Sequence, residues 1–282
     1  MPSRNLFSSS GSLGMQKSPS SRAIIIVATL IGILLIGFSF AYYKSQSTIS
    51  TDPHSLCPVG GPPTEIVAIL LDPSDRLGEP QQIQVRGLLS RIRDSMPRFG
   101  LIEVYRLDKG PTSVPQPILH LCNPGTGREL NKLYQNPELA KRRWRTFADS
   151  VMAEIDRQIS SGQQSSSPIF EAVQAIGVRT FRQPGFDNVK KSLVIVSDLL
   201  QNVPSRMDMY KGVPSFETFK TTPYFAQVRA DLNGVRVFMV YLNRPCVPTQ
   251  GVGHVLFWRS YLEYQGAVVD SVYQLFGDKC PV

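Results

Sequence analysis

The chain has 282 residues, of which 42% are hydrophobic and 18% are charged, and its formal net charge is +8. These values are typical of a chain with one sizeable packed domain, and they exclude disorder throughout. The positive charge is not accompanied by a basic tract interleaved with aromatic residues, so a nucleic-acid partner is not expected. We attribute the charge to a solvated surface.

The N-terminal part of the chain predicts a membrane anchor. Residues 1–22 are rich in Ser and Gly and are expected to form a disordered cytoplasmic tail, whereas residues 23–43 carry no charge. An uncharged stretch of this length matches the roughly 20 residues that a helix needs to cross a bilayer. Three basic residues precede it, so the positive-inside rule places the tail in the cytoplasm and the rest of the chain outside, in the periplasm if the source is bacterial. A cleavable signal peptide is the alternative interpretation.

The rest of the chain is expected to form a linker and one domain. Residues 44–63 are dense in Pro and Gly, which indicates a spacer of limited flexibility, and the domain is expected to span residues 64–282. Export makes disulfides credible, whereas the absence of a CxxC pair gives no support to a zinc site. The cysteines are Cys57, Cys122, Cys246 and Cys280.

Apolar runs and helical spacing predict the element order βαββααβαβαβ. The first strand carries the apolar run 66–71 and stops abruptly on polar residues. The later elements, in chain order, are a helix over 79–96, strands over 101–108 and 117–122, a helix over 137–160, a helix capped by Ser167 with Pro168 at its first position, a strand over 191–198, a short helix over 225–232, a strand over 235–242, a helix over 252–265 and a strand over 268–276. This order predicts an α/β, doubly wound, mostly parallel six-stranded sheet with helices on both faces and one antiparallel edge strand.

Polar residues follow two of the predicted strands. Asp72, Ser74 and Asp75 come after the first strand, and Asp198 ends the strand over 191–198. Ligands of open α/β sheets lie outside the carboxyl ends of the strands, so this edge is the predicted site. A purely structural role remains open, in which Asp72 and Ser74 cap the following turn and helix and Asp198 accepts from backbone amides.

Three segments together resemble the von Willebrand factor A domain over roughly residues 64–276. They are Asp72-Pro-Ser74, Ser167-Pro-Ile-Phe-Glu-Ala and Val-Ile-Val-Ser-Asp198. The metal-ion-dependent adhesion site of that family holds Mg²⁺ or a similar cation with a DxSxS segment, a Thr from a second loop and an Asp after the fourth strand. The resemblance implies that Asp72 and Ser74 are the first two ligands, that Ser167 replaces the Thr and that Asp198 is the last acid.

Arg76 departs from this pattern, because it occupies the third position of DxSxS and a guanidinium cannot bind a cation. Two interpretations remain. Arg76 points away while Asp75 or water fills the gap, or Arg76 replaces the cation by pairing with Asp72 or Asp198.

The topology that the resemblance implies also predicts the disulfides. If the third strand is antiparallel, Cys122 ends at the sheet edge where Cys57 approaches the first strand. Cys246 and Cys280 follow two adjacent parallel strands at the other edge. The predicted pairs are therefore Cys57 with Cys122 and Cys246 with Cys280.

An insertion over 207–222 follows the strand that ends on Asp198 and is expected to be irregular. It forms either a lip that binds a partner or a loop packed on its own side chains. The residues predicted to contact a partner are Asp75, Arg76, Met209, Tyr210 and Phe216.

These observations predict a membrane-anchored, extracytoplasmic protein-binding module of an envelope assembly, with a divalent cation such as Mg²⁺ at the degenerate adhesion site. The alternative is a metal-free structural scaffold of a membrane complex. A hydrolase has the least support, and no enzymatic activity is expected, because the sequence has no GxSxG elbow, P-loop or GxGxxG motif and its histidines lack metal-ligand spacing.

Overall fold

The computed structural model describes residues 21–46, 50–72, 74, 77–107, 115–128, 136–161, 166–244 and 246–277. The chain divides into two compact units, one before and one after residue 48. The predicted site residues Asp75 and Arg76 and the predicted disulfide residue Cys280 lie outside the described residues.

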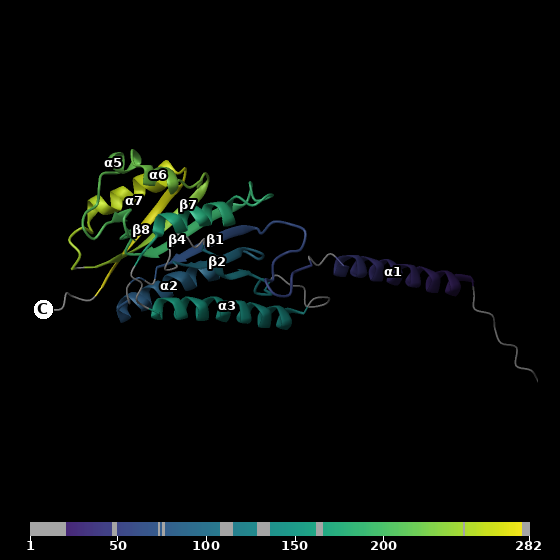
Figure 1. Ribbon diagram of the computed structural model, residues 1–282. Coiled ribbons are helices and arrows are strands. Elements are labelled where there is room, and N and C mark those ends of the chain that lie inside the picture. Colours follow the sequence, from purple (N-terminus) through teal and green to yellow (C-terminus); the bar gives the residue numbers. More distant parts are fainter. Residues whose placement is uncertain are drawn as a thin grey trace, which may run out of the picture. The chain divides into compact units, whose positions relative to one another are not determined.

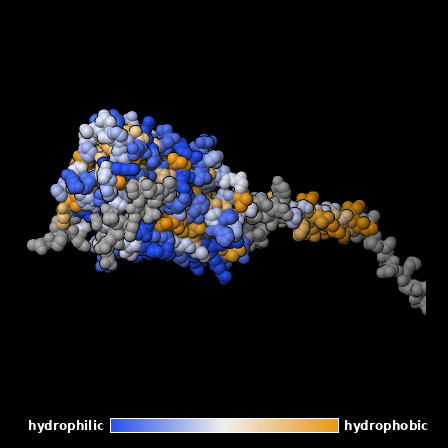
Figure 2. Space-filling model, viewed as in Figure 1, coloured by the Kyte–Doolittle hydropathy of each residue, from blue (hydrophilic) through white to orange (hydrophobic). Residues whose placement is uncertain are grey.

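The first unit contains one helix, α1 (Ser21–Gln46). Its segment Ile24–Tyr42 is long and apolar enough to cross a membrane, and hydrophobic side chains cover it in Figure 2. A signal sequence near an N-terminus has the same properties, so the helix alone does not decide between an anchor and a signal peptide.

The second unit is built on a six-stranded sheet with the order β3-β2-β1-β4-β7-β8 (Figure 1). Every neighbouring pair is parallel except β2 and β3, which are antiparallel. The predicted fold class is therefore confirmed. The strands are β1 (Glu65–Leu71), β2 (Leu101–Arg106), β3 (Pro117–Cys122), β4 (Lys190–Ser197), β7 (Val235–Asn243) and β8 (Val268–Phe276).

Helices cover both faces of this sheet (Figure 1). Side chains alternate along β1, so Ile66, Ala68 and Leu70 join one core cluster, and the residues between them join the other. The first cluster packs against α4 (Ile169–Ile176), the π-helical turn η1 (Gly177–Phe181), α5 (Phe216–Lys220), α6 (Pro223–Gln227) and α7 (Val252–Tyr264). The second packs against α2 (Glu79–Ser95) and α3 (Pro137–Ser160).

The predicted helix over 225–232 is wrong in its bounds. The helix α6 runs from Pro223 to Gln227, because Thr222 accepts a hydrogen bond from the amide of Phe225 and Pro223 stands in the first turn. The chain leaves the helix at Val228, whose carbonyl accepts a hydrogen bond of 2.8 Å from Tyr261.

The insertion over 207–222 is more regular than expected. It begins with β6 (Met207–Asp208), which pairs with β5 (Asn202–Val203), and it ends with α5. Its Phe219 stacks on Phe170 of α4 with ring centroids 5.0 Å apart, and its Met209 is fully buried. Much of the insertion is therefore part of the core, and the side chain of Met209 is not accessible to a partner.

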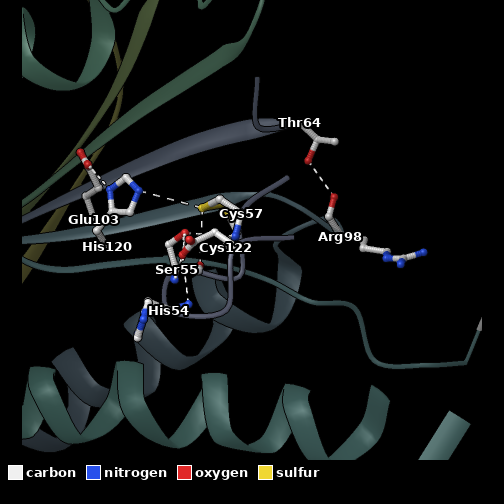
Figure 3. Close-up of a disulfide and its surroundings, with 9 residues drawn as sticks. His54, Ser55, Cys57, Thr64, Arg98, Glu103, His120 and Cys122 are labelled. Atoms are coloured by element: carbon white, nitrogen blue, oxygen red, sulfur yellow. Dashed lines mark hydrogen bonds and ion pairs between the residues drawn. A yellow bond between two sulfur atoms is a disulfide. The ribbon is translucent and has the colours of Figure 1, made fainter. Parts of the chain in front are cut away.

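A disulfide fastens residues 50–59 to the edge strand β3 (Figure 3). The predicted pair Cys57–Cys122 is confirmed, with Cα atoms 4.8 Å apart. Beside it, the amide of Cys122 donates to the carbonyl of Ser55 over 2.8 Å. Cys246 is also disulfide-bonded, but its predicted partner lies outside the described residues, so that pairing stays a prediction.

Candidate functional site

The predicted site lies where β1 and β4 end side by side. The amide of Asp72, the first residue after β1, donates to the carbonyl of Val196 on β4 over 3.0 Å. This bond continues the pairing of the two strands for one residue and brings the buried carboxylate of Asp72 to the end of β4.

The carboxylate of Asp72 collects donors from three separate segments. Its Oδ2 atom accepts from the hydroxyls of Ser167, at 2.8 Å, and Ser197, at 2.7 Å. Its Oδ1 atom accepts from the amide of Ser74 at 2.9 Å. The structure thus brings the predicted residues Asp72, Ser74 and Ser167 together. The sequence analysis missed Ser197, although it immediately precedes Asp198.

The loop that carries Ser167 is fixed by its backbone and not by a helix cap. Ser167 and Asn202 exchange two backbone hydrogen bonds of 2.8 and 3.1 Å. The expectation that Ser167 caps the next helix is wrong, because α4 begins at Ile169 and its first amides donate to Oε1 of the buried Gln201. The hydroxyl of Ser167 therefore donates to Asp72 instead.

Asp198, the predicted last acid, is paired with a cation of the chain itself. Its Oδ2 atom lies 3.4 Å from Nε of Arg244, which follows β7, and its Oδ1 atom accepts from the amide of Leu200 at 3.0 Å. Only 1% of the Asp198 side chain and 16% of the Arg244 side chain are exposed. The side chain of Gln250 links the ends of β4 and β7 by donating to the carbonyls of Asp198 and Leu242.

Among the described residues, the donor set differs from that of the adhesion site at its last acid. A hard cation needs several oxygen ligands in one array, but Asp198 faces a guanidinium, and the two oxygens of Asp72 accept from three protein donors. A cation between the two acids would also lie close to the charge of Arg244. No group of three or more His, Cys, Asp or Glu side chains among the described residues is arranged to hold a metal.

A buried polar chain continues from Asp198 into α7. Leu199 has a positive φ of 59°, and its carbonyl accepts from His254 Nε2 at 3.0 Å and from Trp258 Nε1 at 2.7 Å. A proton on Nε2 of His254 would donate to that carbonyl and leave Nδ1 to accept from the Tyr241 hydroxyl at 2.8 Å, while Trp258 Nε1 lies 3.1 Å from Nε2. Burial lowers the pKa of His254 to about 4, and burial and the charge of Asp198 raise the pKa of Tyr241. Both side chains are therefore neutral near pH 7.

A groove of about 610 Å³ lies beside this polar chain. The insertion forms one wall with Phe216, and α7 forms the other with Leu256 and Phe257. Ser215, Gln250, His254 and Ser260 also line it. We call the side chains around Asp72 and Asp198 the acidic cluster. Gln250 and His254 line the groove and also bind the carbonyls of Asp198 and Leu199, so they connect the groove to the acidic cluster.

The residues predicted to contact a partner fall into three groups. Phe216 is half-buried and lines the groove, and Tyr210 is 38% exposed. Met209 belongs to the core, as described above. Asp75 and Arg76 lie outside the described residues.

No protein-family model and no curated protein matches the chain. Among solved structures, the chain is similar to BatB from Bacteroides thetaiotaomicron, with 12% identity and a TM-score of 0.38 over 76% of this chain and 91% of BatB. It is similar to proximal thread matrix protein 1 from the mussel byssus, with 14% identity and a TM-score of 0.38 over 76% of this chain and 44% of that one. The latter protein has also been solved with zinc in its MIDAS motif. At these TM-scores the similarity carries no conclusion about the site.

Proposed function

We propose that this chain is a von Willebrand factor A-like protein-binding module, held at a membrane by α1, which binds its partner without a cation. The strand order of the sheet supports the family resemblance. So does the hydrogen-bonded cluster of Asp72, Ser74 and Ser167, because the resemblance implies that these three residues share one site.

The observation that carries the proposal is the groove between the insertion and α7. Its walls expose apolar surface, with Leu256 54% exposed, and the polar residues Ser215 and Ser260 also line it. A concave, largely apolar site with a small number of placed polar groups is the usual form of a binding site. We infer that an extended segment of a partner protein occupies it.

The acidic cluster has a supporting role in this proposal. Asp72 joins the ends of β1 and β4 to the Ser167 loop, and the pair of Asp198 and Arg244 joins the ends of β4 and β7. Arg244 thus supplies the positive charge that a cation supplies in the adhesion site. A fixed internal charge makes the shape of the groove independent of metal supply.

The proposed role is not catalytic. Ser167 and Ser197 are buried, and their hydroxyls both donate to the carboxylate of Asp72, so we assign them a structural role. His254 binds Tyr241 and the carbonyl of Leu199, so its ring nitrogens are engaged within the core.

We further propose that the tail lies in the cytoplasm and that the domain lies outside, within an envelope assembly. The basic residues Arg4, Lys17 and Arg22 before the apolar segment support this orientation. The disulfide Cys57–Cys122 supports an oxidising compartment for the domain.

Site-specific photo-crosslinking in intact membranes tests the binding role. We expect a photoreactive residue at position 256 to capture a protein partner in the presence of EDTA, because the groove needs no metal. The matched control is position 83 on α2, where Ile83 is similarly exposed but far along the chain from the groove. Capture at both positions alike, or at neither, would contradict a binding role for the groove.

A cation-dependent adhesion module is the second candidate. The convergence of Asp72, Ser74 and Ser167 favours it, because these are three of the implied ligands. In that case, EDTA would abolish the crosslink at position 256 and Mg²⁺ would restore it.

A further inference from the structure

The two edge strands of the sheet differ in how far other parts of the chain cover them. The edge strand β3 has six residues, begins with Pro117, and is covered by residues 50–59 through Ser55 and the disulfide Cys57–Cys122 (Figure 3). The edge strand β8 has nine residues and contains neither Pro nor a basic residue. No described strand pairs with its outer side. Among the described elements, β8 is therefore the open edge.

The strand β8 also lacks the charges that keep open edges apart. Its single charged residue, Asp270, binds Arg236 of β7 at 2.7 Å. Three of its apolar side chains are exposed: Val268 at 58%, Tyr273 at 45% and Phe276 at 64%. A long apolar edge without Lys, Pro or an inward charge is a template for pairing with another strand.

A bulge limits the part of β8 that can pair regularly. Val237 of β7 lies opposite Val269 and the next residue, Phe238, lies opposite Ser271, so Asp270 is an extra residue. Beyond the bulge, residues 271–276 alternate without interruption. Val272 packs against the core cluster that includes α7, and Leu275 packs against the core cluster that includes α2.

We propose that β8 pairs with β8 of a second copy of this chain, antiparallel, with the two-fold axis at Gln274. With the axis perpendicular to the sheet, the α7 faces of the two copies lie on one side of the joined sheet and their α2 faces on the other. Residues that lie opposite each other must therefore belong to the same face. Centred on Gln274, this register places Val272 opposite the second copy's Phe276 and Tyr273 opposite its Leu275. The two Gln274 amides meet at the axis.

This register explains why the occupant is a second copy. Every apolar residue from 272 to 276 meets an apolar residue, and aromatic side chains opposite aliphatic ones are favourable cross-strand pairs. The single polar position meets itself, and two amides can exchange hydrogen bonds because each has a donor and an acceptor. Asp270, the charged residue, lies outside the paired segment 272–276. The inference does not depend on the proposed function of the groove.

Cysteine crosslinking of the full chain in native membranes tests the pairing and its register. We expect Gln274→Cys to form a covalent dimer upon mild oxidation, because the two residues adjoin at the axis. Val272→Cys alone should not form one, since its partner is Phe276, whereas the double variant Val272→Cys/Phe276→Cys should. Phe276→Lys added to Gln274→Cys should abolish the dimer.

Leu139→Cys is the matched control, because Leu139 is exposed on α3, which packs beside β2 and β3. It should remain monomeric under the same oxidation. A monomeric Gln274→Cys variant, equal crosslinking at positions 272 and 274, or a Gln274→Cys adduct to a different protein would each overturn the proposal. Circular dichroism of each variant separates a failure to fold from a failure to pair.

Discussion

Asp198 and Arg244 form a nearly buried ion pair at the carboxyl ends of β4 and β7. Removing one partner of a buried ion pair costs up to about 3–5 kcal/mol. The pair keeps a 3.4 Å separation and the Arg244 side chain remains 16% exposed, so we expect Arg244→Met to lower the unfolding free energy by about 3 kcal/mol. Denaturant unfolding in detergent, followed by tryptophan fluorescence, measures this change.

A surface ion pair provides the control for that variant. Arg259 and Glu263 lie 3.7 Å apart on α7, and both are exposed. We expect Arg259→Met to cost less than about 1 kcal/mol. Equal effects of the two substitutions would show that Arg244 is only a surface charge.

His254 predicts a pH dependence of stability. Burial holds its folded-state pKa at about 4, against an ordinary value of 6.5, so the unfolded chain binds more protons between these pH values. Its contribution to stability is therefore present above pH 6.5 and is lost as the pH falls toward 4, by at most about 1.4 kcal/mol per pH unit.

Unfolding free energies of the wild type and His254→Gln between pH 4 and pH 7 measure this effect. We expect the variant to be less stable at pH 7, because the flexible Gln side chain loses rotamer freedom when it takes the place of the rigid ring between Tyr241 and Leu199. Its stability should also fall less steeply with acid than that of the wild type. Parallel curves would contradict a buried neutral histidine.

At the acidic cluster, which is formed around Asp72 and Asp198, the sequence predicted both acids as well as Ser74 and Ser167. Asp72, Ser74 and Ser167 stand in recognisable segments, and their contacts agree with the expectation that the segments converge. Arg244, Ser197, Gln201 and Gln250 were missed, because no motif marks them. One signal was available: Arg244 follows the strand adjacent to the one that ends on Asp198, so a parallel sheet places both at one edge.

At the scale of elements, the disulfide Cys57–Cys122 attaches residues 50–59 to β3. The two cysteines are 65 positions apart in the sequence, so the bond closes a long loop. Replacing both cysteines by Ser should lower the unfolding free energy by about 2–4 kcal/mol, mostly through the gain of freedom of the unfolded chain.

Hydrogen exchange distinguishes this loss from a general weakening of the domain. The amides of Asp52, Leu56 and Val59 are bonded within the fastened segment, and they should exchange faster in the double Ser variant than in the wild type. The amides of β1 should remain among the slowest to exchange in both proteins. Unchanged exchange over residues 50–59 would show that the hydrogen bonds alone hold the segment.

Element length decided which parts of the fold the sequence could predict. The strands β1, β4 and β7 have continuous apolar runs and were placed within about one residue. The elements β5, β6 and α5 span two to five residues, too few to show a period. The start of α6 was readable from Thr222 and Pro223, but the expected helix ignored this signal.

At the scale of the whole molecule, the orientation across the membrane is open to a direct experiment. Protease added to right-side-out vesicles should digest the domain, and protease added to inverted vesicles should remove only the tail before α1. The protein should remain in the membrane after washing at high pH. Release of a shortened chain would identify the apolar segment as a cleaved signal peptide instead.

Calorimetry with the full chain in detergent decides whether Arg244 takes the place of a bound cation at the acidic cluster. Titration with Mg²⁺, Mn²⁺ or Zn²⁺ should give no saturable heat, and none of these ions should raise the melting temperature. Asp72→Ala provides the comparison, because it removes the acceptor of Ser167 and Ser197. A one-site binding heat in the wild type that disappears in Asp72→Ala would contradict the account.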